Sequence, residues 1–264
     1  MSENTGLAKS QDAARETHEP FAARGAAPCD GLTACVEAAA EVLYAAALHR
    51  HLRDMPRREI DFFVNARRLE LLDRLAGPEL RKKGTDILNA ACGPFALEFY
   101  LQLRDARITS FDREPCLVPL HRDLVSSGLI AQSNFEVADV SAFRAPRAFN
   151  AIIINDLFYS KHVDFYGLID KYIGFLKPSG LLYFDIQDRR AGPIWRAFGK
   201  DSEYRRYDLS EVAGALRSRG MMVETMTPVL GVKGGVDRVL RQCLWQTAGL
   251  ANSFAFVARK TAGV

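Results

Sequence analysis

Glycine and acidic or amide residues stand at the ends of four predicted strands, where they could bind a nucleoside-containing ligand. Gly93 lies in the turn after the first strand, and Asp112 follows the second strand nineteen positions later. Asp139 follows the third strand, and Asn155 and Asp156 end the fourth. In a doubly wound sheet, ligands bind in the crevice outside the carboxyl ends of the strands. We therefore expect these side chains to meet in one cleft.

Each of these positions suits a different part of such a ligand. Gly93 has no Cβ, so the backbone there can approach a bound group closely. Asp112 is placed to accept hydrogen bonds from ribose hydroxyls, and Asp139 to receive an adenine amino group. Both aspartates have a simpler interpretation as caps of the helix or turn that follows. Asn155 and Asp156 would face the reacting part of the ligand, or would be satisfied polar groups that end a buried strand.

The fourth strand and the loop after it supply three candidate catalytic side chains. These are Asn155, Tyr159 and His162, of which His162 could reach the cleft as a general base. Phe158 and Tyr159 are the candidates for a ring face against a positively charged part of the ligand, a contact that contributes about 0.5 to 2 kcal/mol. Most of the other aromatic residues in this region are expected to belong to the core.

From residue 85 onward, short apolar runs alternate with helical stretches, which is typical of stacked β-α-β units. We expect an α/β fold with a doubly wound, mostly parallel sheet of seven strands, the last one antiparallel. Pro228 and the glycines after it favour no helix before the last strand. The predicted strands are Asp86 to Ala91, Arg107 to Phe111, Asn134 to Val137, Asn150 to Asn155, Gly180 to Ile186, Met221 to Thr227 and Ser253 to Arg259. The predicted helices between them are Phe95 to Arg104, Pro115 to Ser127, Asp164 to Leu176 and Leu209 to Arg219.

Two further helices are predicted ahead of this core, Thr33 to Arg53 and Glu59 to Leu75, with a break at Gly77-Pro78. Residues 1–30 are polar without apolar periodicity and are expected to form a mobile tail. The chain thus divides into a tail (1–30), an N-terminal helical lid (31–80) and a core (84–264). These helices would close over the cleft and select the acceptor, or would form a packed interface without any role as a lid.

Composition restricts the class of ligand and partner. The 35 basic and 32 acidic residues leave a net charge of +3, and no clustered basic face indicates nucleic-acid binding. No apolar run approaches the ~20 residues that cross a bilayer, and the first residues lack a secretory signal pattern. The five cysteines form no C-x-x-C pair and have no histidines at ligand spacing. We expect a cytoplasmic protein that acts on a small molecule without a metal; the pattern does not indicate an oligomeric state.

The strand-end residues, together with Leu176-Lys177-Pro178-Ser179-Gly180 before the fifth strand, resemble the class I S-adenosylmethionine (SAM)-dependent methyltransferases. The resemblance spans roughly residues 85 to 260. It implies that the loop after the first strand holds the methionine part of SAM, Asp112 the ribose diol, and Asp139 with Val140 the adenine. The loop departs from the family, which usually has several glycines where this chain has only Gly93. The expected SAM-binding residues are Ala91, Cys92, Gly93, Phe95, Asp112, Arg113, Asp139, Val140, Asn155, Asp156 and Phe158.

A SAM-dependent methyltransferase that acts on a small molecule is the leading hypothesis, but a fold does not determine its reaction. The runner-up is a SAM cyclase or lyase, in which the amino group of SAM attacks its own γ-carbon to give azetidine-2-carboxylate and methylthioadenosine. An altered glycine loop, an aromatic pocket and no obvious acceptor base suit that reaction. Aminocarboxypropyl transfer would release methylthioadenosine only with a second substrate present. A nicotinamide-dependent oxidoreductase is disfavoured because G-x-G-x-x-G is missing after the first strand, and a non-catalytic binding module stays open.

Overall fold

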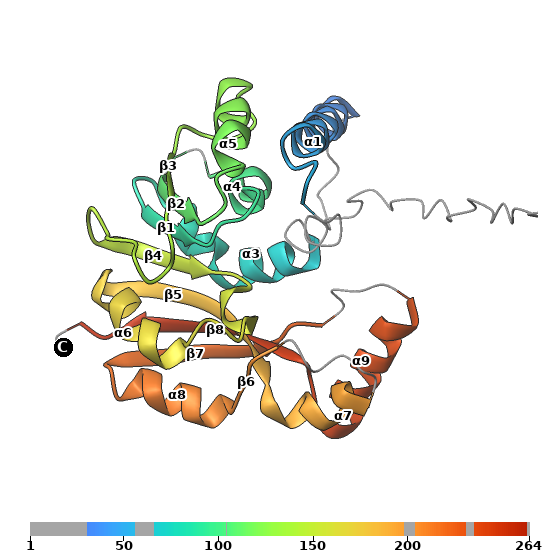
Figure 1. Cartoon of the computed structure of the whole chain (residues 1–264), viewed down its shortest axis with the longest axis vertical. Helices are drawn as coiled ribbons and strands as arrows, with labels where there is room; N and C mark the ends of the chain where they lie inside the picture. The colour runs from blue at the N-terminus through green and yellow to red at the C-terminus, as the bar shows by residue number, and fades with distance from the viewer. Residues whose placement is uncertain (1–30, 56–65, 104, 198–203, 231–234, 263–264) are drawn as a thin grey trace, which may run out of the picture.

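The computed structural model describes residues 31–55, 66–103, 105–197, 204–230 and 235–262. The predicted tail (1–30) and the beginning of the second predicted helix (59–65) lie outside these residues. In the described part of the chain, one mixed sheet runs through the molecule with helices on both faces (Figure 1). None of the helices described there is long and apolar enough to cross a membrane.

The sheet has the strand order β3-β2-β1-β4-β5-β8-β7, and a short strand, β6, pairs with β5. Strand β8 is antiparallel to both of its neighbours, whereas the other neighbouring pairs are parallel. This order confirms the predicted doubly wound sheet with an antiparallel last strand. The strands are β1 (Asp86–Ala90), β2 (Arg107–Asp112), β3 (Asn134–Val137), β4 (Phe149–Ile154), β5 (Leu176–Asp188), β6 (Arg206–Tyr207), β7 (Met221–Pro228) and β8 (Ser253–Lys260).

Successive residues of the central strands pack into separate cores on the two faces of the sheet. Leu88 and Ile152 pack on the face covered by α6 and α8, whereas Ile87 and Ile153 pack on the face covered by α3 and α4. The sequence of a parallel strand that is buried on both faces is mostly a continuous apolar run, as in β4. These helices are α3 (Ala66–Leu80), α4 (Ala96–Leu101), α6 (Phe165–Gly174) and α8 (Leu209–Arg217).

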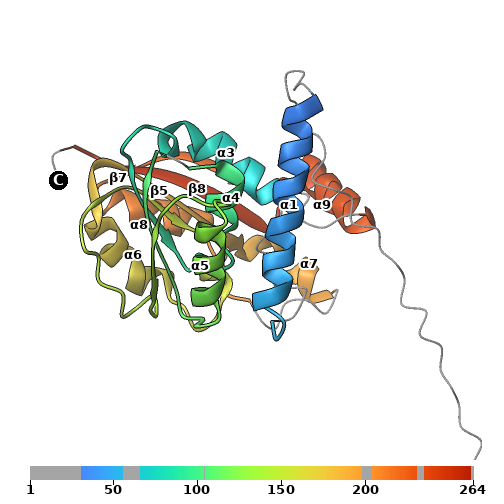
Figure 2. The ribbon, with the colours of Figure 1, turned by 90° about the horizontal axis from the view of Figure 1, so that it is seen from above.

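Helix α1 (Gly31–His51) lies beside α5 (Leu117–Ser126) and close to the loop after β1 (Figures 1 and 2). The Tyr44 ring stacks on Phe99 with a centroid separation of 4.2 Å. The Tyr44 hydroxyl donates a hydrogen bond of 2.7 Å to the carbonyl of Pro94. Helix α1 is therefore anchored to the loop that the sequence assigns to ligand binding.

Two predictions about helices are wrong. Helix α3 does not end at Gly77-Pro78 but continues to Leu80: Pro78 removes one helical donor, and the next turn still forms, with the Arg81 N–H donating to the Gly77 carbonyl at 3.0 Å. A helix, α9 (Gly235–Ala248), does connect β7 to β8. The helix begins at the last of these glycines, Gly235, and Trp245 packs edge-on against Phe254 of β8. The remaining short helices are η1 (Leu157–Tyr159), η2 (Arg189–Ala191) and α7 (Gly192–Ala197).

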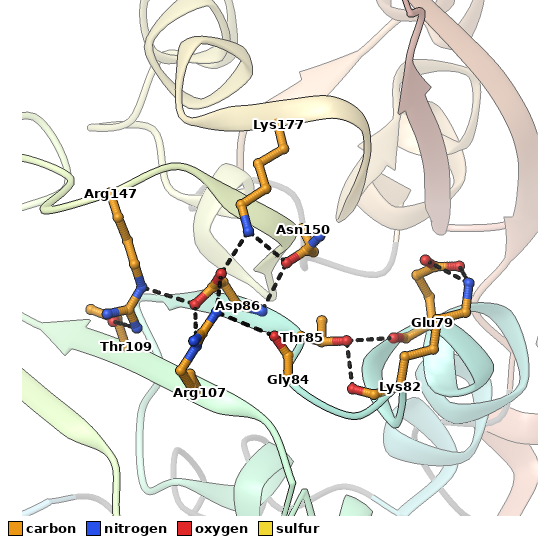
Figure 3. Close-up of polar contacts among 10 residues, drawn as sticks. All are labelled: Glu79, Lys82, Gly84, Thr85, Asp86, Arg107, Thr109, Arg147, Asn150 and Lys177. Carbon is orange, nitrogen blue, oxygen red and sulfur yellow. Dashed lines mark hydrogen bonds and ion pairs between the residues drawn. The ribbon is translucent and has the colours of Figure 1, made fainter.

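Asp86 joins four strands at the end of the sheet where β1 begins (Figure 3). Its carboxylate accepts hydrogen bonds from Arg107 of β2 at 2.8 Å and Lys177 of β5 at 2.6 Å, and it pairs with Arg147 at 3.1 Å. Its backbone N–H donates to Oδ1 of Asn150 in β4 at 3.0 Å. Burial raises the pKa of Asp86, but the hydrogen bonds from Arg107 and Lys177 outweigh burial and hold the pKa below its ordinary value.

Candidate functional site

A cavity of about 480 Å³ lies at the carboxyl ends of β1, β2, β3 and β4. Its volume falls within the roughly 300–1,000 Å³ of small-molecule sites. Eight residues of the expected SAM-binding set line it: Ala91, Gly93, Asp112, Arg113, Asp139, Val140, Asn155 and Asp156. The four strand ends therefore do meet at one site, as the sequence predicts.

The loop after β1 has the backbone of a glycine-rich turn although it contains one glycine. Ala91, Gly93 and Phe95 have φ of 51°, 57° and 62°, so every second residue is in the left-handed region. Glycine adopts that region freely, whereas a residue with a Cβ is strained there by about 1–2 kcal/mol. Ala91 and Phe95 therefore adopt a backbone conformation that favours glycine. Such strain often accompanies ligand-binding loops.

Asp112 links the end of β2 to this loop. Its carboxylate accepts hydrogen bonds from the backbone N–H of Gly93 at 3.0 Å and from that of Glu114 at 3.1 Å. Burial raises the pKa of Asp112, and these backbone donors oppose the rise. Helix α5 begins later, after Cys116, so Asp112 does not cap it. The two backbone donors hold the carboxylate in place at the cavity wall.

Asp139 caps the turn that follows it and also lines the cavity. Its carboxylate accepts hydrogen bonds from the backbone N–H and the hydroxyl of Ser141, as a turn cap would. The hydrogen bonds from Ser141 lower the pKa of Asp139, so the carboxylate is ionised at neutral pH. Asp139 and Val140 also line the cavity. The cap therefore fixes the carboxylate where a ligand can reach it.

A buried carboxyl group joins the helix after the β1 loop to the strands β1 and β2. Glu98 of α4 accepts hydrogen bonds from the Asn89 side chain in β1 at 3.0 Å and from the Ser110 hydroxyl in β2 at 2.5 Å. Burial raises the pKa of Glu98, against the effect of these two donors. The contacts tie α4 to the two strands whose ends form the cavity wall.

Arg68 of α3 lies between two buried aspartates at neighbouring strands. Its guanidinium pairs with Asp156, which follows β4, and with Asp185 in β5. Asp185 also accepts hydrogen bonds from the Tyr159 hydroxyl at 2.9 Å and from the Asp156 backbone N–H at 2.8 Å. Burial raises the pKa of Asp156 to about 6, and Arg68 opposes that rise. One cation thus faces two carboxylates beside the cavity.

Two buried oxygens at this place have no hydrogen-bond donor among the described residues, Oδ1 of Asn155 and Oδ1 of Asp156. An unsatisfied buried acceptor costs about 1–3 kcal/mol, so most have a partner. Both residues line the large cavity and also a second one of about 20 Å³, which Arg68 borders. Acceptors placed in this way suit a donor group that a ligand brings, such as an ammonium.

Five residues of the candidate set do not line the large cavity. Phe158 is fully buried against Phe165 and Phe184, with centroid separations of 5.1 and 5.8 Å, so its ring belongs to the core. The Tyr159 hydroxyl is directed to Asp185. The remaining three are Cys92 and Phe95, both buried against α1 and α5, and His162, which is exposed. The aromatic pocket expected around a sulfonium is therefore not formed by Phe158 or Tyr159.

Other residues of the cavity wall were not predicted as site residues. Asp54 and Met55, which follow α1, line the cavity, as do Glu114 and Cys116. Their sequence context is that of an ordinary loop, and only the packing of α1 brings the first two there. Arg68 did carry a signal, since a charged residue on the same helix face as Leu71 and Leu72 requires a buried partner.

The charges around the cavity favour a cation. Among the described residues, the acidic ones that line it are Asp54, Asp112, Glu114, Asp139 and Asp156, and the one basic residue is Arg113, which donates a hydrogen bond to Glu114 at 3.1 Å. Clefts lined by one sign of charge concentrate ligands of the opposite sign. The sulfur of SAM is positively charged, so the acidic wall fits this cosubstrate. Among the described residues, no group of three or more histidine, cysteine or acidic side chains could hold a metal.

Solved structures share this architecture. The N-methyltransferase NodS from Bradyrhizobium japonicum WM9, in complex with S-adenosyl-L-homocysteine, matches with a TM-score of 0.55 over 83% of this chain and 98% of that chain, at 17% identity. Magnesium protoporphyrin IX methyltransferase (ChlM) from Synechocystis PCC 6803, with the same molecule bound, gives 0.53 over 74% and 84%, at 12% identity. The chain has the fold of the class I SAM-dependent methyltransferases.

This methyltransferase fold also includes a protein with a different named reaction. The [4+2]-cyclase SpnF matches with a TM-score of 0.53 over 74% of this chain and 81% of that chain, at 17% identity. No known protein-family model matches the chain. At these identities the likeness concerns the fold, and the reaction has to be argued from the site.

Proposed function

We propose that the protein is a SAM-dependent transferase of the cytoplasm that methylates a small molecule. The observation that carries the proposal is the acidic cavity of about 480 Å³ at the carboxyl ends of β1 to β4. A cationic nucleoside fits both its place in the fold and its charge. When bound, SAM supplies a methyl group on a positively charged sulfur.

The cavity residues take distinct roles in this proposal. The loop with Ala91, Gly93 and Phe95 binds the methionine part of SAM. Cys92 and Phe95, which are buried against α1 and α5, hold this loop in place. Asp112 accepts from the ribose hydroxyls, and its two backbone donors keep it oriented for that contact. Arg113 borders the same part of the cavity, and Asp139 with Val140 is assigned the adenine. The buried Phe158 ring supports the end of β4 without touching the ligand.

In-line methyl transfer depends mainly on orientation and exclusion of water. The N-terminal helical segment is proposed as the lid, because Asp54 and Met55 close one wall and Tyr44 fastens α1 to Pro94. Asn155 is proposed to contact the ligand through its buried Oδ1. Tyr159 acts through Asp185, to which its hydroxyl donates. His162, exposed next to the cavity residue Val163, is the candidate base for an acceptor.

A second candidate function is supported by the acceptors at the end of β4. The amino group of SAM would attack its own γ-carbon, the carbon–sulfur bond would break with its electron pair leaving on methylthioadenosine, and one proton would be lost. That reaction needs an amine to be held and deprotonated. Asp156, with its pKa raised to about 6 by burial, is ionised at neutral pH and lies with Asn155 at the cavity wall.

Mass spectrometry of the purified protein with SAM alone separates the two candidates. A heat-denatured sample corrects for spontaneous decay of SAM, and Asp112→Asn is the matched variant, expected to lower either activity. Methylthioadenosine above the control, with a cyclic amino acid, would establish the γ-carbon reaction and exclude methyl transfer as the main activity. Binding of SAM without turnover would require a second substrate, and methylated product from an acceptor library would then establish methyl transfer. No binding of SAM would contradict both.

A further inference from the structure

Arg68 connects an N-terminal helix to the place where the candidate site carries its buried charge. It belongs to α3, which also packs on the sheet through Leu71, Leu72 and Leu80 and pairs Glu79 with Arg259 of β8 at 3.7 Å. Its guanidinium reaches past these residues to Asp156 and Asp185, with side-chain exposures of 6%, 8% and 1% for the three groups. Its carbon Cζ also lies 5.6 Å from the centre of the Tyr159 ring.

Buried ion pairs contribute little net stability, because the loss of hydration offsets the attraction between the charges. The apolar face of α3 already packs on the sheet, so docking of this helix does not require a buried arginine. Arg68 is instead in contact with the carboxylate that borders the cavity. Its contact with Asp156 points to a role at the site.

We propose that Arg68 is a positioning residue, which keeps Asp156 ionised and fixed at the cavity wall so that a positively charged ligand is bound there. The inference rests on the proposed function, since the ligand class is that of SAM. With this role for Arg68, the site also depends on the position of α3 on the sheet. A displaced α3 would remove the cation and leave two buried carboxylates side by side, of which one would take up a proton.

The groups that face Asp156 determine the expected pH dependence. Arg68 comes from α3, Tyr159 from η1, and Asp185 and Tyr183 from β5. Burial raises the pKa of Tyr183 beyond the ordinary tyrosine value, so this phenol is neutral at pH 5 to 9. Among these described groups, Arg68 is the cation, and its charge and hydrogen bond lower the pKa of Asp156; Asp185 is the second carboxyl group that shares it.

The test compares Arg68→Gln with Arg74→Gln, the same substitution at an exposed position of the same helix. Calorimetry would give the affinity for SAM from pH 5 to 9. In the wild type and in Arg74→Gln, we expect affinity to fall below about pH 6 as Asp156 takes up a proton. Loss of an adjacent cation raises a carboxyl pKa by about 1–3 units. Arg68→Gln should therefore bind SAM about tenfold more weakly at pH 7 and within about threefold of wild type at pH 9.

S-adenosylhomocysteine sharpens the assignment because it keeps the ammonium of SAM but carries no charge on its sulfur. If Asp156 faces the ammonium, both ligands should depend equally on pH and on Arg68. If Asp156 faces the sulfonium, S-adenosylhomocysteine should depend less on both. The proposal would be overturned if Arg68→Gln folds and its affinity for SAM falls at the same pH as that of the wild type. An equal loss at all pH values would also overturn it, because that result would indicate a purely structural role.

Two further measurements keep the proposal testable. If Arg68→Gln does not fold, Asp185→Asn removes the carboxylate that shares Arg68 with Asp156. The pH midpoint of SAM affinity should then move down by about one unit, and an unchanged midpoint would contradict the proposal. Carbon-13 titration of the aspartate carboxyls, with Asp156→Asn for assignment, reports the protonation of Asp156 without any ligand. If the wild type does not bind SAM, the proposed function fails, while this titration in wild type and Arg68→Gln still decides whether Arg68 controls Asp156.

Discussion

Two buried aspartates at opposite ends of the sheet have contrasting surroundings. Asp86, where β1 begins, contacts Arg107, Arg147 and Lys177, and these cations hold its pKa below the ordinary value (Figure 3). Asp156, where β4 ends, shares Arg68 with a second carboxylate, and burial raises its pKa to about 6. Among the described residues, three cations surround the carboxylate of Asp86, whereas Asp156 and Asp185 share one.

The two ends of the strands therefore differ in role: buried charges stabilise the fold where the strands begin, and they are available to a ligand where the strands end. At the beginning of the strands, the charges of Asp86 are satisfied within the chain, and the contacts join β1, β2, β4 and β5. At the carboxyl ends, Asp156 keeps an oxygen without a donor among the described residues, beside a cavity with an acidic wall. An incompletely satisfied charge is costly to the fold, and a positively charged ligand would relieve the cost.

The strongest effect is expected from Asp112→Ala at the carboxyl end. Two hydrogen bonds to a carboxylate contribute about 1.5–3 kcal/mol each, so affinity for SAM should fall at least about a hundredfold. The fold should persist, because the backbone groups of Gly93 and Glu114 can be hydrated at the cavity. Calorimetry measures the affinity and circular dichroism the fold. Unchanged affinity would remove Asp112 from the ribose assignment.

Asp86→Asn should show the opposite pattern. Removal of one partner from a buried pair costs about 3–5 kcal/mol, and partial exposure of the three cations reduces this to about 2 kcal/mol. Urea unfolding should reveal the loss, with affinity for SAM within about twofold of wild type. The stabilising effect of Asp86 should disappear as pH falls below about 4, because its folded-state pKa is depressed. A weakened SAM affinity in a folded variant would break the contrast between the two ends.

Asp156→Asn should lower the affinity for SAM about tenfold at pH 8, because the neutral amide attracts a positively charged ligand less than the carboxylate does. The folded-state pKa of Asp156 is raised, so the wild type becomes less stable as pH rises from about 4 to about 6. The asparagine variant lacks that titration and should gain stability relative to wild type over the same range. Thermal unfolding at several pH values measures the trend. A variant that loses stability as Asp86→Asn does would make Asp156 a structural residue.

A smaller effect, in stability, is expected from Ala91→Gly in the loop after β1. Ala91 has φ of 51°, and glycine would relieve the left-handed strain, offset by its greater freedom in the unfolded chain. We expect a gain of up to about 1 kcal/mol in the free energy of unfolding, with SAM still bound. A loss of stability would show that the packing of the Ala91 Cβ stabilises the fold by more than the left-handed backbone strain destabilises it.

Tyr159 should give the smallest change when only its hydroxyl is removed. Tyr159→Phe loses the hydrogen bond to Asp185 and should lower turnover by less than about tenfold. Tyr159→Ala also empties a buried site and should lower stability by about 3 kcal/mol. Steady-state kinetics and unfolding of both variants separate hydroxyl from ring. Equal activity in all three proteins would make Tyr159 irrelevant to the reaction.

The sequence predicts much of this architecture because strands and turns are local features. Apolar runs bounded by glycine, proline and aspartate indicated the seven main strands, the parallel pairing of the first five and the antiparallel last one. Helix α9 was missed because the glycines before it were interpreted as interrupting the whole connection. The cavity position and eight of its lining residues followed from the strand ends, since parallel strands bring those ends together.

What the sequence alone determined is therefore the set of residues that a single strand and its turn carry to the cavity: Gly93, Asp112, Asp139, Asn155 and Asp156. The tertiary structure decided which side chains point there. It turned Phe158 into the core, directed Tyr159 to Asp185, and brought Arg68 from a helix 88 positions before Asp156 in the chain. Spacing along the chain contains no record of such contacts, because they depend on how the faces of separate elements pack.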